Sequence, residues 1–78
     1  MTDQNQTPEQ ILKAVGQRIR DLRLQHGWSQ RTMAEKAVMN KGHLGDIERG
    51  ERDLSISTLE RIATALRMEV SALLEGVA

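Results

Sequence analysis

Residues 29–50 read SQRTMAEKAVMNKGHLGDIERG, and this stretch decides the fold of the chain. Ser29 and Asn40 are residue types that favour the N-cap position of a helix, and apolar residues at helical spacing follow each of them. The pattern predicts one short helix over about residues 30–37. It predicts a second short helix that Asn40 caps and Gly50 ends.

The apolar residues around the two caps support both helices. Trp28 with Met33, and Met39 with Leu44, stand at the spacing of a hydrophobic staple, in which the residue before the cap packs against the fourth helical residue. Leu44 and Ile47 then form the inward stripe of the second helix. Two very short helices joined by about three residues meet the geometric requirement of a helix-turn-helix, whose second helix enters the major groove of DNA.

Two glycines, Gly42 and Gly45, fall inside the second helix, where each costs about 1 kcal/mol relative to alanine. With Leu44 and Ile47 facing the core, the outward arc of the helix is left to Lys41, Gly42, Gly45, Asp46 and Arg49. This arc is either a surface that reads DNA bases or the solvated side of an ordinary helix. The spacing alone leaves both interpretations open.

The N-terminal flank predicts a longer helix. Thr7, Pro8 and Gln10 form a helix start with a capping box, and Gly27 stands where a glycine ends the helix, near Gln25. The preceding residues are polar, so we expect a disordered segment at residues 1–7.

The C-terminal flank predicts two further helices. Ser57 with Glu60 forms a second capping box, and Ser71 is placed to cap a last short helix. The expected fold class is all-α, with five helices in a single domain over residues 8–78.

The composition of the 78 residues excludes several classes of protein. There is no cysteine, hence no disulfide framework and no thiolate metal site. No apolar run approaches the ~18 residues that cross a bilayer, and the polar N-terminus lacks the pattern of a secretory signal. We therefore expect a cytoplasmic protein with no membrane partner.

Catalytic and metal-binding constellations are not expected either. Ser29, Asp46 and Glu48 do not compose an acid/base or nucleophile set, and His26 and His43 have no further ligand at metal-binding spacing. We expect no enzyme, no cofactor, no metal and no small-molecule ligand.

The charge distribution favours a nucleic-acid partner although the net charge is zero. Residues 13–52 hold nine Lys or Arg against five Asp or Glu, whereas the flanks on either side carry a net negative charge. A basic middle between acidic ends can present a positive surface while keeping indiscriminate binding to polyanions low.

The chain from Gly16 to Leu74 resembles the Cro/C1-type helix-turn-helix family, also called the XRE family, of phage repressors and their bacterial relatives. The resemblance is carried in order by IRDLRLQHGWSQRTMAEKA, LGDIERGER and LERIATALRMEVSALL. Within that family the run IERGERDLSISTLERIATAL is most similar to the controller proteins of restriction-modification systems. The resemblance implies a five-helix, lambda-repressor-like DNA-binding domain.

The resemblance also assigns roles to individual positions. It implies that Gln30 touches the DNA backbone and braces the recognition helix. Arg23 and Glu48 match a family ion pair between the first helix and the end of the recognition helix. The positions that would contact bases or phosphates are Gln30, Arg31, Asn40, Lys41, Gly42, His43, Asp46, Arg49 and Arg52.

Side-chain chemistry limits what the recognition helix could read. Lys41 could donate to guanine, whereas Asp46 could accept from the amino group of cytosine and would repel phosphate. Relatives often carry glycine in the turn before this helix, where the chain has Val38, so the turn is expected to be either different or strained.

The expected function is sequence-specific transcription regulation, in which a homodimer binds a roughly palindromic operator on double-stranded DNA. Apolar residues placed for the dimer interface are Leu54, Ile56, Met68 and Val70, although all four could equally belong to the core. The alternative is an antitoxin that binds a toxin protein and represses its own operon. A purely structural helical bundle is a third possibility.

Overall fold

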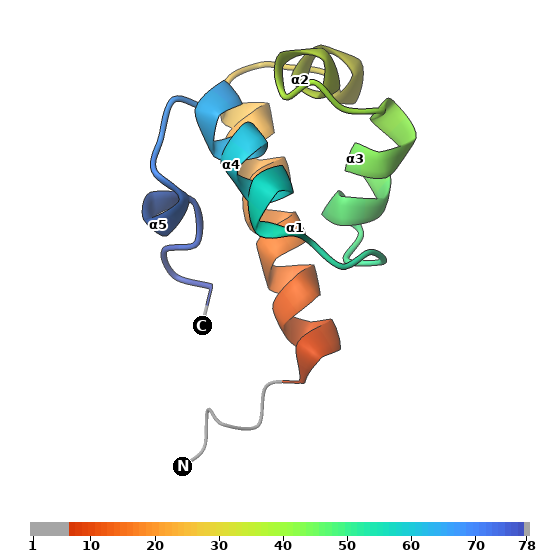
Figure 1. Ribbon diagram of the computed structural model, residues 1–78, viewed down its shortest axis with the longest axis vertical. Helices are drawn as coiled ribbons and strands as arrows, with labels where there is room; N and C mark the ends of the chain where they lie inside the picture. Colours follow the sequence, from red (N-terminus) through yellow and green to blue (C-terminus); the bar gives the residue numbers. More distant parts are fainter. Residues whose placement is uncertain (1–6, 78) are drawn as a thin grey trace.

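The computed structural model describes residues 7–77, so residues 1–6 of the expected disordered segment, and Ala78, lie outside the described residues. The described part of the chain is all-helical, as predicted. Figure 1 shows α2 and α3 on one side of the long α1, and α5 on the other. The helices are α1 (Pro8–Gln25), α2 (Gln30–Lys36), α3 (Lys41–Glu48), α4 (Ile56–Ala65) and α5 (Val70–Leu73).

The predicted caps of the first three helices are confirmed. The Thr7 hydroxyl accepts from the Gln10 backbone N–H at 3.2 Å, and the Gln10 side chain accepts from the Thr7 N–H at 2.9 Å, which completes the capping box. Ser29 accepts from the Thr32 N–H at 3.0 Å and so caps α2. Each cap satisfies helix N–H groups that have no partner within the helix.

The predicted caps of the last two helices are wrong. Helix α4 begins two residues early because Ser55, not Ser57, accepts from the Thr58 N–H at 3.1 Å. With Ser55 as cap, Leu54 and Leu59 take the two positions of a hydrophobic staple, and both are part of the core or packed against it. This apolar pairing is absent when Ser57 is the cap.

Helix α5 also begins earlier than predicted. Its N-cap position is held by Glu69, which makes no side-chain capping hydrogen bond, and Ser71 lies inside the helix. Met68 and Leu73 occupy the staple positions around Glu69, so apolar packing has decided where the helix begins.

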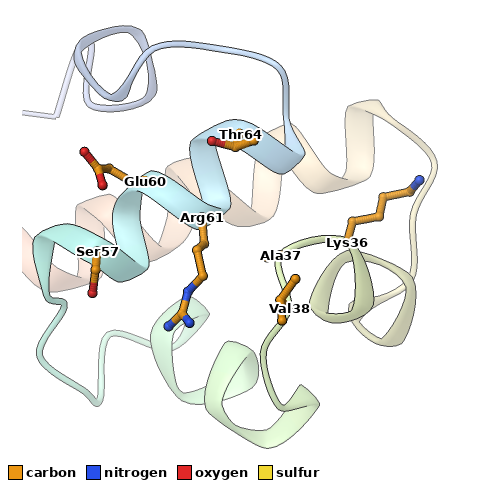
Figure 2. Close-up of a pocket in the computed structure, with 7 residues that line it drawn as sticks. All are labelled: Lys36, Ala37, Val38, Ser57, Glu60, Arg61 and Thr64. Carbon is orange, nitrogen blue, oxygen red and sulfur yellow. The ribbon is translucent and has the colours of Figure 1, made fainter.

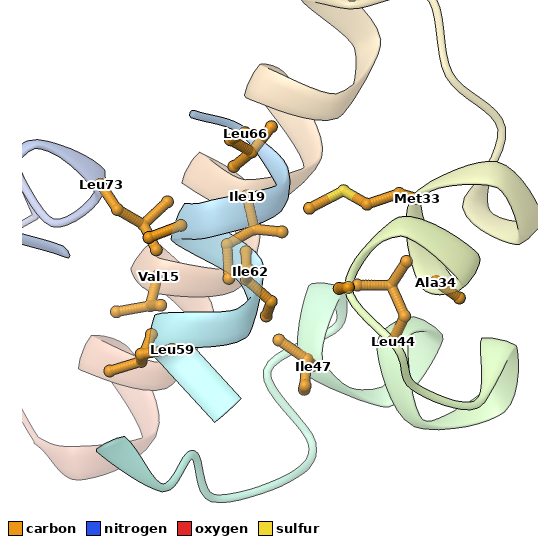
Figure 3. Packing of buried hydrophobic residues seen from close by; sticks show 12 residues of the cluster. Val15, Ile19, Met33, Ala34, Leu44, Ile47, Leu59, Ile62, Leu66 and Leu73 are labelled. Atoms are coloured by element: carbon orange, nitrogen blue, oxygen red, sulfur yellow. The ribbon is translucent and has the colours of Figure 1, made fainter. Parts of the chain in front are cut away.

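The core lies where the five helices meet. Ile19 of α1 and Ile62 of α4 are fully buried at its centre, and Figure 3 shows Leu44 and Ile47 of α3 pointing toward them. Met33 of α2 and Leu73 of α5 complete the fully buried set of large side chains. The core is aliphatic, as the composition requires.

Helices α1 and α3 approach so closely that their contact admits no side chain at two glycines. A Cβ built on Gly16 of α1 would lie 2.2 Å from the carbonyl oxygen of Ile47. A Cβ on Gly50, just after α3, would lie 2.8 Å from the Cα of Lys13. Gly50 also has a φ of +74°, which L residues with side chains adopt at a cost. The α1–α3 contact therefore depends on glycine at both positions.

Arg18 fastens α5 to α1. Its Nε donates to the carbonyl oxygen of Leu73 at 3.1 Å, and its Nη2 donates to that of Ala72 at 2.9 Å. These carbonyls belong to the end of α5, where helix carbonyls lack partners within the helix. A cationic side chain at this end also complements the helix dipole.

Candidate DNA-binding surface

The first turn of α3 is held by its cap. The Asn40 Oδ1 accepts from the backbone N–H of Gly42 at 2.7 Å and from that of His43 at 3.2 Å. Because the cap fixes this turn, the exposed side chain of Lys41 and the half-buried His43 project from a defined backbone.

The turn between α2 and α3 keeps a left-handed conformation although it contains no glycine. Val38 has a φ of +55°, and its side chain is 74% exposed. Its N–H donates to the Glu35 carbonyl at 3.2 Å, and the Met39 N–H donates to the Ala34 carbonyl at 2.9 Å, the two bonds of a Schellman motif. Of the two alternatives expected for this turn, a different conformation or a strained one, the structure shows the strained one.

A buried ion pair anchors α3 to α1. Arg23 Nε donates to Glu48 Oε2 at 2.7 Å and Arg23 Nη2 donates to Glu48 Oε1 at 3.0 Å, with side-chain exposures of 9% for Arg23 and 2% for Glu48. Arg23 also donates to the Trp28 carbonyl at 2.9 Å. Such a bidentate pair fixes both the distance and the orientation of its two helices.

Gln30 joins the same network from α2. Its Nε2 donates to Glu48 Oε1 at 3.0 Å, so the first residue of α2 braces the end of α3. Helices α1, α2 and α3 are thus linked through one carboxylate. The outward side of α3 is held at a fixed orientation to the rest of the domain.

An open, polar hollow runs along the outward side of α3, and we call it the α3 hollow. It brings together eight of the nine residues expected to contact DNA, and Gly45 besides. Arg31, the ninth, is exposed in the first turn of α2 and does not line the hollow. The α3 hollow is lined by Gln30, Asn40, Lys41, Gly42, His43, Gly45, Asp46, Arg49 and Arg52.

Gly45 is less exposed than its predicted place on the outward arc of α3 suggests. It is buried, and a Cβ at this position would lie 3.3 Å from Arg49 Nη1 and 3.8 Å from the side-chain amide of Gln30. Gly42 is exposed as expected, and a Cβ there would meet Asn40 Oδ1 at 3.0 Å. The folded-back Arg49 side chain, four residues along the helix, covers Gly45.

Charged side chains cluster at the C-terminal end of α3. Asp46 Oδ1 accepts from Arg49 Nη2 at 2.5 Å, and Asp46 Oδ2 accepts from Arg52 Nη2 at 3.1 Å. Arg49 Nε also donates to Glu51 Oε1 at 3.0 Å. The hydrogen bond with Glu51 is the chief reason why the pKa of Arg49 is raised above its ordinary value. We call these four residues the α3 charge cluster.

The four residues expected at a dimer interface differ in exposure. Leu54, Met68 and Val70 are half-buried and pack against the core. Ile56, at the start of α4, is 69% exposed. Of the four, only Ile56 is exposed, whereas the other three contribute to the packing of this chain.

Another hollow lies between the α2–α3 turn and α4, and Figure 2 shows its lining residues. Glu60 and Arg61 project from α4, and Val38 contributes its exposed side chain from the turn. This hollow includes none of the residues expected to contact DNA.

Within residues 7–77 no three His, Cys, Asp or Glu side chains are placed to share a metal ion. In that part of the chain no helix combines the length and apolar character that a bilayer span needs.

Sequence reasoning missed Gly16 and Arg18. The close approach of α1 to α3 at Gly16 could have been suspected from a glycine in the middle of a long helix, because such a glycine costs about 1 kcal/mol unless packing requires it. Nothing in the local sequence identifies Arg18 as a partner of carbonyls more than fifty positions away.

Comparison with known proteins gives concordant matches. The helix-turn-helix family HTH_3 matches residues 19–73. The immunity repressor of Bacillus phage phi105 is 46% identical over 59 residues, which cover 76% of this chain and 41% of the repressor. The chain thus spans less than half of that relative's length.

Restriction-modification controller proteins are also among the matches. The control protein C.BamHI of Bacillus amyloliquefaciens is 34% identical over 61 residues, covering 77% of this chain and 75% of that protein. The crystal structure of the controller protein C.AhdI of Aeromonas hydrophila superposes with a TM-score of 0.78 at 39% identity, over 80% of this chain and 94% of the other.

Proposed function

The chain belongs to the helix-turn-helix family of DNA-binding transcription regulators, of the Cro/C1 type, and on that premise we propose that it binds a specific operator through the outward side of α3. The proposal includes action in the cytoplasm, where bacterial and phage operators lie.

The observation that carries the proposal is the α3 hollow. It gathers Lys41, Arg49 and Arg52 with the amide side chains of Gln30 and Asn40 on one open surface. Ammonium, guanidinium and amide groups are the donors that phosphates and the base edges of the major groove accept. A helix is about 10–12 Å wide with its side chains, which matches a major groove about 12 Å wide.

The rigid support of α3 favours specific binding rather than loose electrostatic attraction. Glu48 ties the end of α3 to Arg23 and Gln30, so donors on the outward side approach DNA in one orientation. Pre-oriented donors lose little conformational entropy on binding.

The finer proposal is a homodimer on a roughly palindromic operator. A single short α3 can contact only a few base pairs, and a two-fold symmetric pair would place two copies in successive major grooves about 34 Å apart. Of the four residues expected at the interface, Ile56 is the one that is exposed, so its burial against a second copy would remove an aliphatic side chain from water.

The similarity to C.BamHI and C.AhdI supports the further proposal that the chain controls a restriction-modification system. Adjacent genes for a DNA methyltransferase and an endonuclease would support that role, and an adjacent toxin gene would instead support the antitoxin alternative. No observation on this chain favours the antitoxin alternative at present.

Selection of bound sequences from random duplex DNA tests the proposal. We expect enrichment of one symmetric sequence, and sedimentation of the resulting complex should give two chains per duplex. Failure to enrich any symmetric sequence would overturn the homodimer on a palindrome.

A single variant then tests the α3 hollow. Lys41→Ala should weaken binding to the selected duplex by about 1–3 kcal/mol and relax the preference at one base pair, if Lys41 contacts a base. An equal loss on all sequences would show that Lys41 contacts phosphate. An unchanged affinity would remove it from the interface.

A further inference from the structure

The α3 charge cluster raises a question about its two arginines. Arg49 and Arg52 line the α3 hollow and are placed to contact DNA, yet both are paired with Asp46 in the free protein. Lys41, in the same hollow, makes no ion pair within residues 7–77. On binding DNA, Arg49 and Arg52 would have to break ion pairs with Asp46, whereas Lys41 would break none within residues 7–77.

Within the α3 charge cluster, Asp46 binds both guanidinium groups at once. Each carboxylate oxygen of Asp46 holds one arginine, Oδ1 through Arg49 Nη2 and Oδ2 through Arg52 Nη2. The Arg49 side chain lies over Gly45, where a Cβ would approach Nη1 to 3.3 Å. Positive φ at Gly50 turns the chain so that Glu51 and Arg52 return to the end of α3.

Phosphate competes directly with this arrangement. A phosphate oxygen offers a guanidinium the same kind of charged acceptor as a carboxylate does, so every duplex must compete with Asp46 for Arg49 and Arg52, and the arginines leave Asp46 only at a cost. The carboxylate would then stay in the interface without its partners and would repel phosphate. A loss of this kind is common to all DNA sequences.

A base edge can compensate Asp46 only at particular positions. In the major groove the hydrogen-bond donors are the amino groups of cytosine and adenine, and a carboxylate accepts from the cytosine amino group. A duplex that presents such a donor opposite Asp46 restores its hydrogen bonding while the arginines move to phosphates.

We infer that Asp46 is a selectivity residue, which weakens binding to DNA in general more than binding to the operator by withholding Arg49 and Arg52 until a base amino group replaces them. This inference rests on the proposed function, since it concerns how the same surface distinguishes sequences. Asp46 would then act in two ways, by contacting a base and by pairing with Arg49 and Arg52 when no base donor is available.

The cluster can be altered without unfolding the domain. The side chains of Asp46, Arg49, Glu51 and Arg52 are 32%, 57%, 61% and 50% exposed. Ion pairs this exposed contribute little to stability because solvent and salt screen them. Changes in DNA binding can therefore be separated from changes in folding.

Asp46→Asn is the test, because it removes the charge and keeps the size. Binding of the full chain is measured on the selected operator and on a random duplex over a range of salt concentrations. We expect affinity for the random duplex to rise about fivefold or more, and the ratio of operator to random affinity to fall about tenfold or more. The salt dependence on random DNA should steepen by about one unit of slope.

Glu51→Gln is the matched control. Glu51 pairs with Arg49 and does not line the α3 hollow, so its removal should raise the affinity for both duplexes and leave their ratio unchanged. Thermal unfolding of both variants should match that of the wild type.

Each other outcome overturns the inference. Random-duplex affinity that is unchanged or lower in Asp46→Asn contradicts the withholding of the arginines. An equal fall of the ratio in Glu51→Gln shows a general charge effect. Wild-type chain that binds no duplex overturns the proposed function, whereas wild-type binding with an unchanged ratio in Asp46→Asn overturns this inference alone.

Discussion

The contact between α3 and α1 differs from the outward side of α3 in which atoms lie next to its glycines. Where α3 meets α1, a Cβ on Gly16 would lie 2.2 Å from the Ile47 carbonyl oxygen, and a Cβ on Gly50 would lie 2.6 Å from the Cγ and 2.8 Å from the Cα of Lys13. On the outward side, a Cβ on Gly42 or Gly45 would first meet a side-chain atom, at 3.0 and 3.3 Å respectively. Backbone moves only with its helix, whereas the exposed end of the Arg49 side chain next to Gly45 can rotate away. Packing therefore requires glycine on the inward side and leaves the outward side free to serve another requirement.

Glu48→Ala should have the largest effect on the inward side. It leaves the Arg23 guanidinium buried without its partner, and removal of one member of a buried pair costs about 3–5 kcal/mol in free energy of unfolding. Thermal unfolding followed by circular dichroism, without DNA, measures the loss. Glu51→Ala is the matched control, since it removes a carboxylate from an exposed pair and should hardly move the midpoint. Midpoints that remain equal in the two variants would show that the Arg23–Glu48 pair does not anchor α3.

Gly16→Ala should follow, with a loss of about 3 kcal/mol. Alanine favours a helix interior over glycine by about 1 kcal/mol, but here its Cβ would collide with the Ile47 carbonyl oxygen and force α1 away from α3. For a domain of this size the unfolding midpoint should fall by roughly 10 °C or more. A midpoint equal to that of the wild type would mean that the α1–α3 contact can widen freely.

Val38→Gly should act in the opposite direction and stabilise the domain by about 1 kcal/mol. A left-handed residue with a side chain costs about 1–2 kcal/mol, and the greater freedom of glycine in the unfolded chain offsets part of the gain. The lost side chain is largely exposed, so little burial is sacrificed. Urea unfolding compares the two chains, and a less stable variant would show that the turn is not strained.

Gly45→Ala should have the smallest effect on folding, a gain of about 0.5 kcal/mol. Helix propensity favours alanine by about 1 kcal/mol, and the displacement of Arg49 removes part of that gain. Operator affinity, measured by fluorescence anisotropy, should nevertheless fall severalfold because the added methyl group lies in the α3 hollow, where the DNA would approach. A destabilisation as large as that of Gly16→Ala would abolish the difference between the two sides of α3.

Local sequence rules predicted the elements well where a polar cap and an apolar staple agree. At Ser29 and Asn40 both signals coincide, and α2 and α3 begin where expected. At Ser57 the cap signal alone was misleading, because Leu54 and Leu59 form their staple around Ser55. The apolar spacing was therefore the better guide to where α4 begins.

Contacts between distant segments could not be predicted in the same way. The clash that demands glycine at Gly16 depends on how closely α1 crosses α3, and the bonds of Arg18 depend on where α5 docks. The charge cluster also escaped prediction. Asp46 is expected to accept from a base, and Arg49 and Arg52 to contact bases or phosphates, but the hydrogen bond from Arg52 to Asp46 depends on the turn at Gly50, which brings Arg52 back to the end of α3.

The central claim is that DNA binds on the outward side of α3, and chemical-shift mapping tests it most directly. The 15N-labelled chain is titrated with the selected operator while its backbone amide signals are followed. We predict that the largest shifts fall within residues 40–52 and at Gln30, with small shifts over α5. The largest shifts over α4 and α5, with residues 40–52 unchanged, would contradict the claim.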